Sequence, residues 1–191
     1  AVRFKEEAGR EIREYAASAG VPCYGITLGD HVNNKWTLFT NMVVALQPEQ
    51  TGVPVFATIG NHDHEFPTAD EKAARAKYES YFGPVDYSFN RGDVHFIAMD
   101  NIIFTGTEYT GGFTDEQVAW LEKDLSFVPT SKMIVLYYHI PLRDTNYRNR
   151  QKVLDLISKY QNPTLMCAHT HYFQPYHMRS HNLFERIHGG T

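Results

Sequence analysis

One segment organises this sequence: VFATIGNHD, residues 55–63. An apolar run that changes at once into polar residues is typical of a buried strand that presents polar groups at the edge of a sheet. Asn61 and His62 carry side chains that can bind a metal or transfer a proton. The segment therefore predicts a strand whose carboxyl end belongs to a functional site.

Three other segments repeat this pattern. YGITLGD at residues 24–30 ends in Asp30, IVLYYH at 134–139 ends in His139, and TLMCAHTH at 164–171 ends in His169 and His171. In open α/β sheets, ligands bind beyond the carboxyl ends of the strands. Four strands that each end in Asp, Asn or His predict one shared site, and all these residue types can bind a divalent metal.

The composition sets outer limits on the fold and function. The chain has 191 residues, of which 42% are hydrophobic, enough for a sizeable core in one domain. Its net charge of −4 argues against nucleic acid as an obligate partner. Cys23 and Cys167 lie in apolar runs and are interpreted as small buried side chains rather than as a disulfide. No apolar run reaches the roughly 18 residues that a membrane span requires, so no transmembrane segment is predicted.

Helical patterns alternate with the four strands, as in parallel βαβ units. They predict helices over residues 2–19, 35–47, 69–82, 115–125 and 153–160. Thr114 and Gln117 have the spacing of a capping box at the start of the fourth helix. A hairpin is predicted with its turn at residues 90–93, between two strand-like runs. Residues 101–112 are expected to form an irregular connection, and no regular element is expected after His171.

The last motif is the most specific one. Residues i and i+2 at the end of a strand project to the same side, so His169 and His171 are expected side by side. Two neighbouring imidazoles suit two neighbouring metals. His139 adds a third imidazole, Asp30 a carboxylate able to bridge two cations, and Asn61 a neutral oxygen. This set of nitrogen and oxygen ligands favours Zn, Fe or Mn over a Cys-based structural site.

His62 follows Asn61 directly and is a candidate proton donor to a leaving group. His31 and His64 are also close to the site in sequence and are candidates for contacts with the substrate or with the ligands. Each of these residues taken alone is more often a cap, a turn residue or a satisfied polar group. Four independent strand ends that share one pattern favour the metal site.

In this order, Gly-Asp, Gly-Asn-His-Asp, a lone His and His-x-His resemble the motifs of the calcineurin-like metallophosphoesterase superfamily. The resemblance covers most of the chain, so residues 1–191 are interpreted as one such domain, truncated at both ends. It implies a four-layer α-β-β-α sandwich, with two sheets packed face to face and helices outside. It also implies a centre of two divalent transition metals (Mn, Zn or Fe) that hydrolyses phosphate mono- or diesters by attack of a metal-bound hydroxide.

The resemblance also implies a role for each motif residue. Asp30 resembles the bridging carboxylate, and His171 resembles a ligand of the second metal. The residues that resemble the remaining ligands of the first metal are Asn61, His139 and His169. His62 resembles the His that binds no metal, contacts phosphate and protonates the leaving group.

Three features depart from the family pattern. The first strand of the family ends in Asp-x-His or a variant such as Asp-x-Gln, and we expect a segment upstream of Ala1 to carry this motif. Asn33 stands where Asp or Tyr is usual, which argues against an iron–tyrosinate centre and leaves Asp63 or His64 as the candidate to orient His62. Ala168 replaces the usual Gly of the last motif, with little expected consequence.

The leading hypothesis is therefore a metal-dependent phosphohydrolase that acts on a phosphorylated small molecule or another phosphoester. The alternative is a binding or scaffold module of the same fold that has lost catalysis, which only the absent first motif supports. The motifs carry no code for the substrate or the oligomeric state. The sequence looks closest to bacterial multidomain phosphoesterases, some of which are exported, so the cytoplasm and the cell envelope are both open as compartments.

Overall fold

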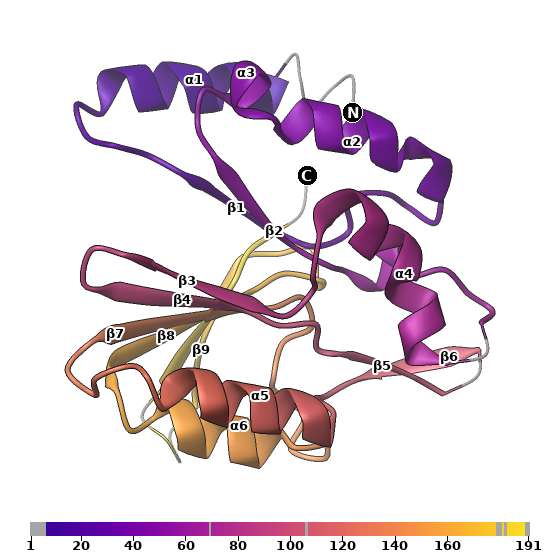
Figure 1. Ribbon diagram of the computed structural model, residues 1–191, viewed down its shortest axis with the longest axis vertical. Helices are drawn as coiled ribbons and strands as arrows, with labels where there is room; N and C mark the ends of the chain where they lie inside the picture. Colours follow the sequence, from indigo (N-terminus) through magenta and orange to yellow (C-terminus); the bar gives the residue numbers. More distant parts are fainter. Residues whose placement is uncertain (1–6, 69, 106, 179–180, 182, 190–191) are drawn as a thin grey trace.

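Two β-sheets packed face to face, with helices on both outer sides, make up the computed structural model of the protein (Figure 1). The structure describes residues 7–189 except 69, 106, 179–180 and 182. One outer layer holds α1 (Gly9–Ser18), α2 (Phe39–Leu46) and α3 (Pro48–Thr51). The other outer layer holds α5 (Asp115–Leu125) and α6 (Arg150–Ile157). This architecture confirms the predicted four-layer α-β-β-α sandwich.

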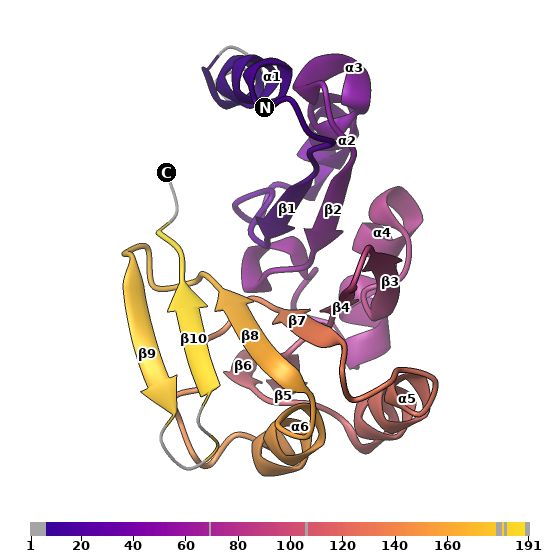
Figure 2. The same cartoon turned by 90° about the vertical axis from the view of Figure 1, so that its left-hand side faces the viewer.

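The two sheets differ in size. The first contains the parallel strands β1 (Gly25–Leu28) and β2 (Val55–Thr58). The second has the strand order β3-β4-β7-β8-β10-β9. Its strands in chain order are β3 (Tyr87–Arg91), β4 (Val94–Ala98), β7 (Met133–Tyr137), β8 (Gln161–Cys167), β9 (Gln174–Met178) and β10 (Leu183–Ile187). The four central strands are parallel, and β3 and β9 are antiparallel strands at the edges (Figure 2).

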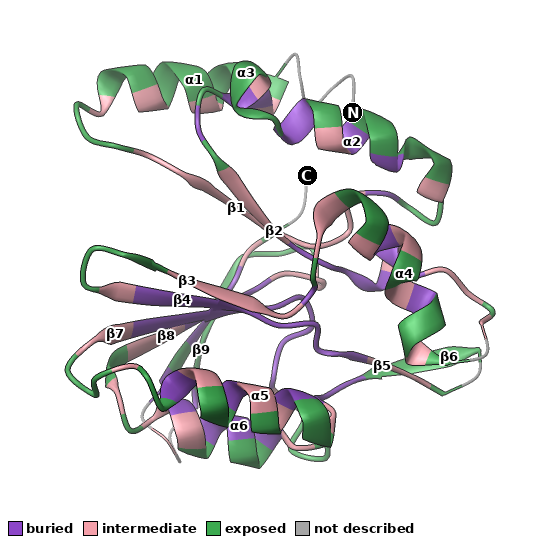
Figure 3. Cartoon of the chain, viewed as in Figure 1, coloured by how far each residue is buried: buried purple, intermediate pink, exposed green. Residues whose placement is uncertain are grey.

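Strand β7 shows how the second sheet fills two interfaces. Side chains alternate along the strand, so Ile134 and Leu136 pack with the helices of the outer layer, while Val135 and Tyr137 pack toward the first sheet. Figure 3 shows β4 and β7 as largely buried strands in the middle of the molecule. A strand covered on both faces is a rigid support for whatever follows its carboxyl end.

Local signals account for the start of two helices and for one hairpin. Helix α4 (Glu71–Phe82) begins after Asp70, whose carboxylate accepts the N–H of Ala73. Helix α5 begins at Thr114 with the predicted capping box. The predicted hairpin is also confirmed, with Arg91 opposite Val94. Short 3₁₀ turns cover Trp36–Leu38, within the second predicted helix, and Asn61–Asp63.

Two predictions about connections are wrong. Within residues 101–112, β5 (Ile102–Thr105) and β6 (Glu108–Gly111) pair as antiparallel strands, where an irregular connection was expected. After His171 the chain forms β9 and β10, where no regular element was expected. Strand β10 pairs with β8 on one side and β9 on the other. These strands depend on partners supplied by the tertiary structure, which short local patterns do not reveal.

The described part of the chain has no helix that is both long and apolar enough to cross a membrane. Residues 2–6 and 69, which belong to predicted helices, lie outside the described residues.

Candidate metal centre

Four potential metal ligands from four segments meet where the carboxyl ends of both sheets converge. One donor atom each of Asp30, His139 and His169 lies within 4.8 Å of the other two. The Oδ1 atom of Asn61 lies 3.0 Å from His139 Nε2 and 3.0 Å from His169 Nδ1. His139 Nε2 is also 3.2 Å from Asp30 Oδ2 and 3.2 Å from His169 Nδ1. The structure therefore brings together the four residues proposed for the first metal.

The orientation of His139 shows why these atoms suit a cation. Its Nδ1 lies 2.6 Å from the carbonyl oxygen of Leu28, which can only accept, so Nδ1 carries a proton. In the neutral ring the lone pair on Nε2 then points at oxygen and nitrogen atoms that also carry lone pairs. A metal ion satisfies all of them at once, and a carbonyl partner on the second ring nitrogen is the usual way to orient a His ligand.

Asp30 is held in an unusual backbone conformation. Its φ is 57°, in the left-handed region, and the carboxylate Oδ1 accepts the backbone N–H of His62 at 3.0 Å. Gly60 lies against it so closely that a Cβ atom there would overlap the backbone nitrogen of Asp30. A Cβ on Gly29 would lie 2.6 Å from His139 Nδ1. Both glycines are therefore required by the close approach of the loops after β1 and β2.

Two pKa shifts favour the protonation states that a metal requires. Burial alone would raise the pKa of Asp30, but the contacts with His139 and His62 together outweigh burial and lower this pKa. A positive charge beside the carboxylate, on the ring or on a metal, thus stabilises its ionised form. Burial, together with the neighbouring His139, lowers the pKa of His169 and keeps its ring neutral. Deprotonated carboxylate and neutral imidazole are the ligand forms.

His62 lines the same cleft, which has a volume of about 410 Å³. Its Nδ1 lies 3.1 Å from Oδ1 of Asn34. This contact corrects the expectation that Asp63 or His64 orients His62. The Asp63 carboxylate instead accepts hydrogen bonds from the N–H groups of Val32 and Gly60, and it thereby joins the loops after β1 and β2. Asn34 directly follows Asn33, the position at which the family usually has Asp or Tyr.

His171 lines the cleft but does not belong to the close group of donor atoms. Strand β8 ends at Cys167, and both His169 and His171 have left-handed backbone conformations, with φ of 67° and 58°. The expected extended strand end is therefore wrong, although both side chains line the same cleft. His171 is exposed, whereas His139 is buried.

The other two candidate histidines support the loops. His31 lies 3.0 Å from Asp63 and 2.7 Å from the hydroxyl of Thr27. His64 is fully buried and contacts the Gly60 carbonyl and Asp100. Burial would lower the pKa of His64, but the charge and hydrogen bond of Asp100, the Gly60 carbonyl and the charge of Asp63 together outweigh burial and raise this pKa.

Sequence reasoning missed Asp100 and Asn101. The signal was present, because the apolar run VHFIAM at residues 94–99 ends in Asp-Asn as the other four strands end in polar residues.

Comparison with known families now identifies the class of this fold and site. A family model described as calcineurin-like phosphoesterase matches residues 18–173. The chain belongs to this family of metallophosphoesterases, as the order of its motifs predicted.

Two known proteins are similar to the chain. A probable glycerophosphodiester phosphodiesterase GpdQ of Arcobacter nitrofigilis is 28% identical over 150 residues, which cover 73% of this chain and 51% of the relative. A purple acid phosphatase, PPD1 from yellow lupin (Lupinus luteus) seeds, superposes with a TM-score of 0.68 at 15% identity. That match covers 95% of this chain and 38% of the lupin chain and shows a shared fold. The chain thus spans about half the length of the curated relative.

Proposed function

We propose that this chain is the metal-binding part of a phosphoesterase that hydrolyses phosphate mono- or diesters. The observation that carries the proposal is the convergence of Asp30, Asn61, His139 and His169 on one point, with lone pairs facing one another. The family and the names of both relatives support phosphoester hydrolysis. The name of the Arcobacter relative, a phosphodiesterase, favours diesters over monoesters as the substrate class.

The donor set fits a divalent transition metal such as Mn, Zn or Fe. Asp30, Asn61, His139 and His169 would hold it, and Asp30 and His171 would contribute to a second one. When bound, such metals polarise a phosphoryl oxygen and make water a nucleophile near neutral pH. Four protein ligands hold a metal well, whereas two leave most of the coordination sphere to water. The chain is therefore proposed to bind one metal tightly and a second one weakly.

His62 would act on the leaving group. Its Nδ1 is fixed by Asn34, and the ring lines the cleft, so Nε2 is the nitrogen left for substrate. A proton on Nε2 would pass to the departing oxygen. The backbone N–H of His62 holds Asp30 at the same time, so the proton donor and the metal ligand keep a constant relation.

Metal titration followed by calorimetry, combined with hydrolysis assays, tests the proposal. We expect one tight site for Mn²⁺ or Zn²⁺ and metal-dependent hydrolysis of bis(p-nitrophenyl) phosphate and p-nitrophenyl phosphate. The diester should be the better substrate. A chain that binds metal without hydrolysing either ester under any metal loading would instead support the binding module. A chain that binds no metal would contradict the site itself.

A further inference from the structure

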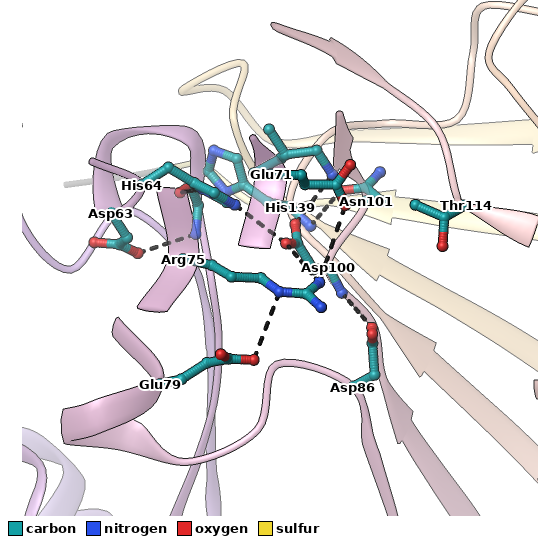
Figure 4. A network of polar contacts seen from close by, with 12 residues as sticks. Asp63, His64, Glu71, Arg75, Glu79, Asp86, Asp100, Asn101, Thr114 and His139 are labelled. Atoms are coloured by element: carbon teal, nitrogen blue, oxygen red, sulfur yellow. Dashed lines mark hydrogen bonds and ion pairs between the residues drawn. The ribbon is translucent and has the colours of Figure 1, made fainter. Parts of the chain in front are cut away.

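Asp100 and Asn101 follow β4, and Figure 4 shows Asp100 beside His64 and Asn101 beside His139. Neither side chain lines the cleft, and both residues are almost fully buried, at 1% and 0% exposure. A pair of buried polar residues requires hydrogen-bonding partners, and the identity of those partners indicates what the pair does.

Asn101 holds the backbone on which His139 is carried. Its Oδ1 accepts the N–H of His139 at 3.2 Å and the N–H of Ile140 at 3.0 Å, and its Nδ2 donates to the Ile140 carbonyl at 2.6 Å. One side chain thus satisfies three backbone groups of two consecutive residues just beyond the end of β7. With the ring held separately by the Leu28 carbonyl, both the backbone and the imidazole of His139 are fixed.

Asp100 reaches the other loop through His64. The Oδ2 atom of Asp100 lies 3.1 Å from His64 Nε2, and His64 Nδ1 lies 2.9 Å from the Gly60 carbonyl oxygen. Gly60 directly precedes the ligand Asn61. All of these side chains are buried, so water does not compete for their hydrogen bonds.

The dipeptide is itself anchored to the surrounding scaffold. The Asp100 N–H donates to Asp86 Oδ1 at 3.0 Å, and the Asp100 carbonyl accepts from Gln117 of α5 at 2.6 Å. Its Oδ1 accepts the N–H of Ile102, and Arg75 of α4 lies 3.8 Å from Oδ2 (Figure 4). Three elements therefore fix the position of Asp100.

We propose that Asp100 and Asn101 are positioning residues that set the separation between the ligands Asn61 and His139. The two ligands come from different sheets, 78 residues apart, and the dipeptide bonds to the loop that carries each of them. Removal of a side chain that orients a metal ligand typically lowers metal affinity by about 10–100-fold. The inference rests on the proposed metal site, and it assigns the geometry of that site to residues that never touch the metal.

Measurements of Co²⁺ binding distinguish a role of Asp100 and Asn101 in positioning the ligands from a role in stability alone. We expect Asn101→Ala and Asp100→Ala each to weaken Co²⁺ binding by about 10–100-fold and to change the visible absorption of bound Co²⁺, which reports coordination geometry. Asp100→Asn keeps the size and one hydrogen-bonding oxygen and should recover most of the affinity. The matched control is His95→Ala, because His95 is 3% exposed and forms a similar, partly buried His–Asp pair with Asp124 at 2.8 Å.

The control should lower the melting temperature and leave the Co²⁺ affinity and spectrum unchanged. If Asn101→Ala is destabilised like the control but binds Co²⁺ with wild-type affinity and spectrum, the positioning role is wrong. Should Asp100→Ala fail to fold, Asn101→Ala and Asp100→Asn still decide the question. A wild-type chain that binds no Co²⁺ refutes the metal site and this inference with it. Binding without hydrolysis refutes only the proposed reaction.

Discussion

The cleft has one closed side and one open side. On the closed side, Asn61, His139 and His169 lie within hydrogen-bonding distance of one another, and bonds from Leu28 and Asn101 hold His139. On the open side, His171 is exposed and lies outside the close group of donor atoms. Metal ligands are preorganised where packed elements surround them, and less so where the surroundings are open.

A second hollow adjoins the metal cleft. Its volume is about 640 Å³, and it runs between β1 on one side and β8 with the segment after β10 on the other. It shares Gly29 and Ala168 with the metal cleft. Among the described strands, β1 pairs only with β2, and Ile26 and Leu28 of β1 line this hollow. The Asp-x-His strand expected upstream of Ala1 stays a prediction.

The largest difference in metal affinity is expected between variants that lose a ligand on the closed side and a variant that loses His171 on the open side. We expect His169→Ala to reduce metal affinity by more than about 100-fold and to remove nearly all hydrolysis, because one of four convergent ligands is lost. Asp30→Asn should act in the same way. His171→Ala should weaken the first metal by less than about tenfold. Calorimetric titration with Mn²⁺ or Zn²⁺ measures all three, and equal losses for His169→Ala and His171→Ala would contradict the distinction.

The proton donor should show the next effect. His62→Ala is expected to keep metal affinity near the wild-type value and to reduce turnover by roughly 10²–10⁴-fold. The deficit should shrink for leaving groups of low pKa, which hardly need a proton. Asn34→Ala removes only the hydrogen-bonding partner of the His62 ring, so it should give a smaller loss of turnover with the same dependence on the pKa of the leaving group. Comparing p-nitrophenyl with alkyl esters tests this, and an equal loss for both would assign His62 to another role.

The closed side can also be strained without removing a ligand. Gly60→Ala places a Cβ atom on the backbone of Asp30, so we expect a loss of about 3 kcal/mol in the free energy of unfolding. Gly25→Ala is the matched control, because its nearest neighbour is a methyl group of Val55 at 3.3 Å. Chemical denaturation of both variants measures the difference. A tolerated Gly60→Ala would show that the two loops are not closely packed.

The last effect depends on pH and concerns Asp86, at the far end of the anchoring network. Burial, with a smaller contribution from Asp100, raises its pKa to about 6 from the ordinary 3.8. Between these values the native state binds more protons than the unfolded state, so this group makes the protein less stable as pH rises. Asp86→Asn removes the penalty and should gain up to about 3 kcal/mol relative to wild type between pH 4 and 7.

An exposed acid provides the opposite sign. Hydrogen bonds from Asn149 and Arg148 lower the pKa of Asp115 to about 2 from the ordinary 3.8, so Asp115→Asn should lose stability relative to wild type as pH rises between these two values. Thermal melts at a series of pH values check both variants. If the stability difference between Asp86→Asn and wild type did not change with pH, the pKa of Asp86 would not be raised by folding.

The sequence by itself determined the strands and the polar residues at their ends. An apolar run that changes abruptly into Gly-Asp, Asn-His-Asp or His is a local feature, and so are the capping box at Thr114 and the β3–β4 turn. These signals were enough to predict an α/β fold with parallel strands and to single out the residues that converge at the cleft, whereas the four layers were implied by the family resemblance.

Only the tertiary structure decided how these residues are held. His139 is oriented by Leu28, 111 residues away, and its backbone is fixed by Asn101, 38 residues away. The hydrogen-bonding partner of His62 is Asn34 rather than a neighbour in sequence. Strand β10 forms by pairing with β8 on one side and β9 on the other. Local patterns specify which groups a strand presents, whereas orientation depends on hydrogen bonds between distant segments that form only when the two sheets pack together.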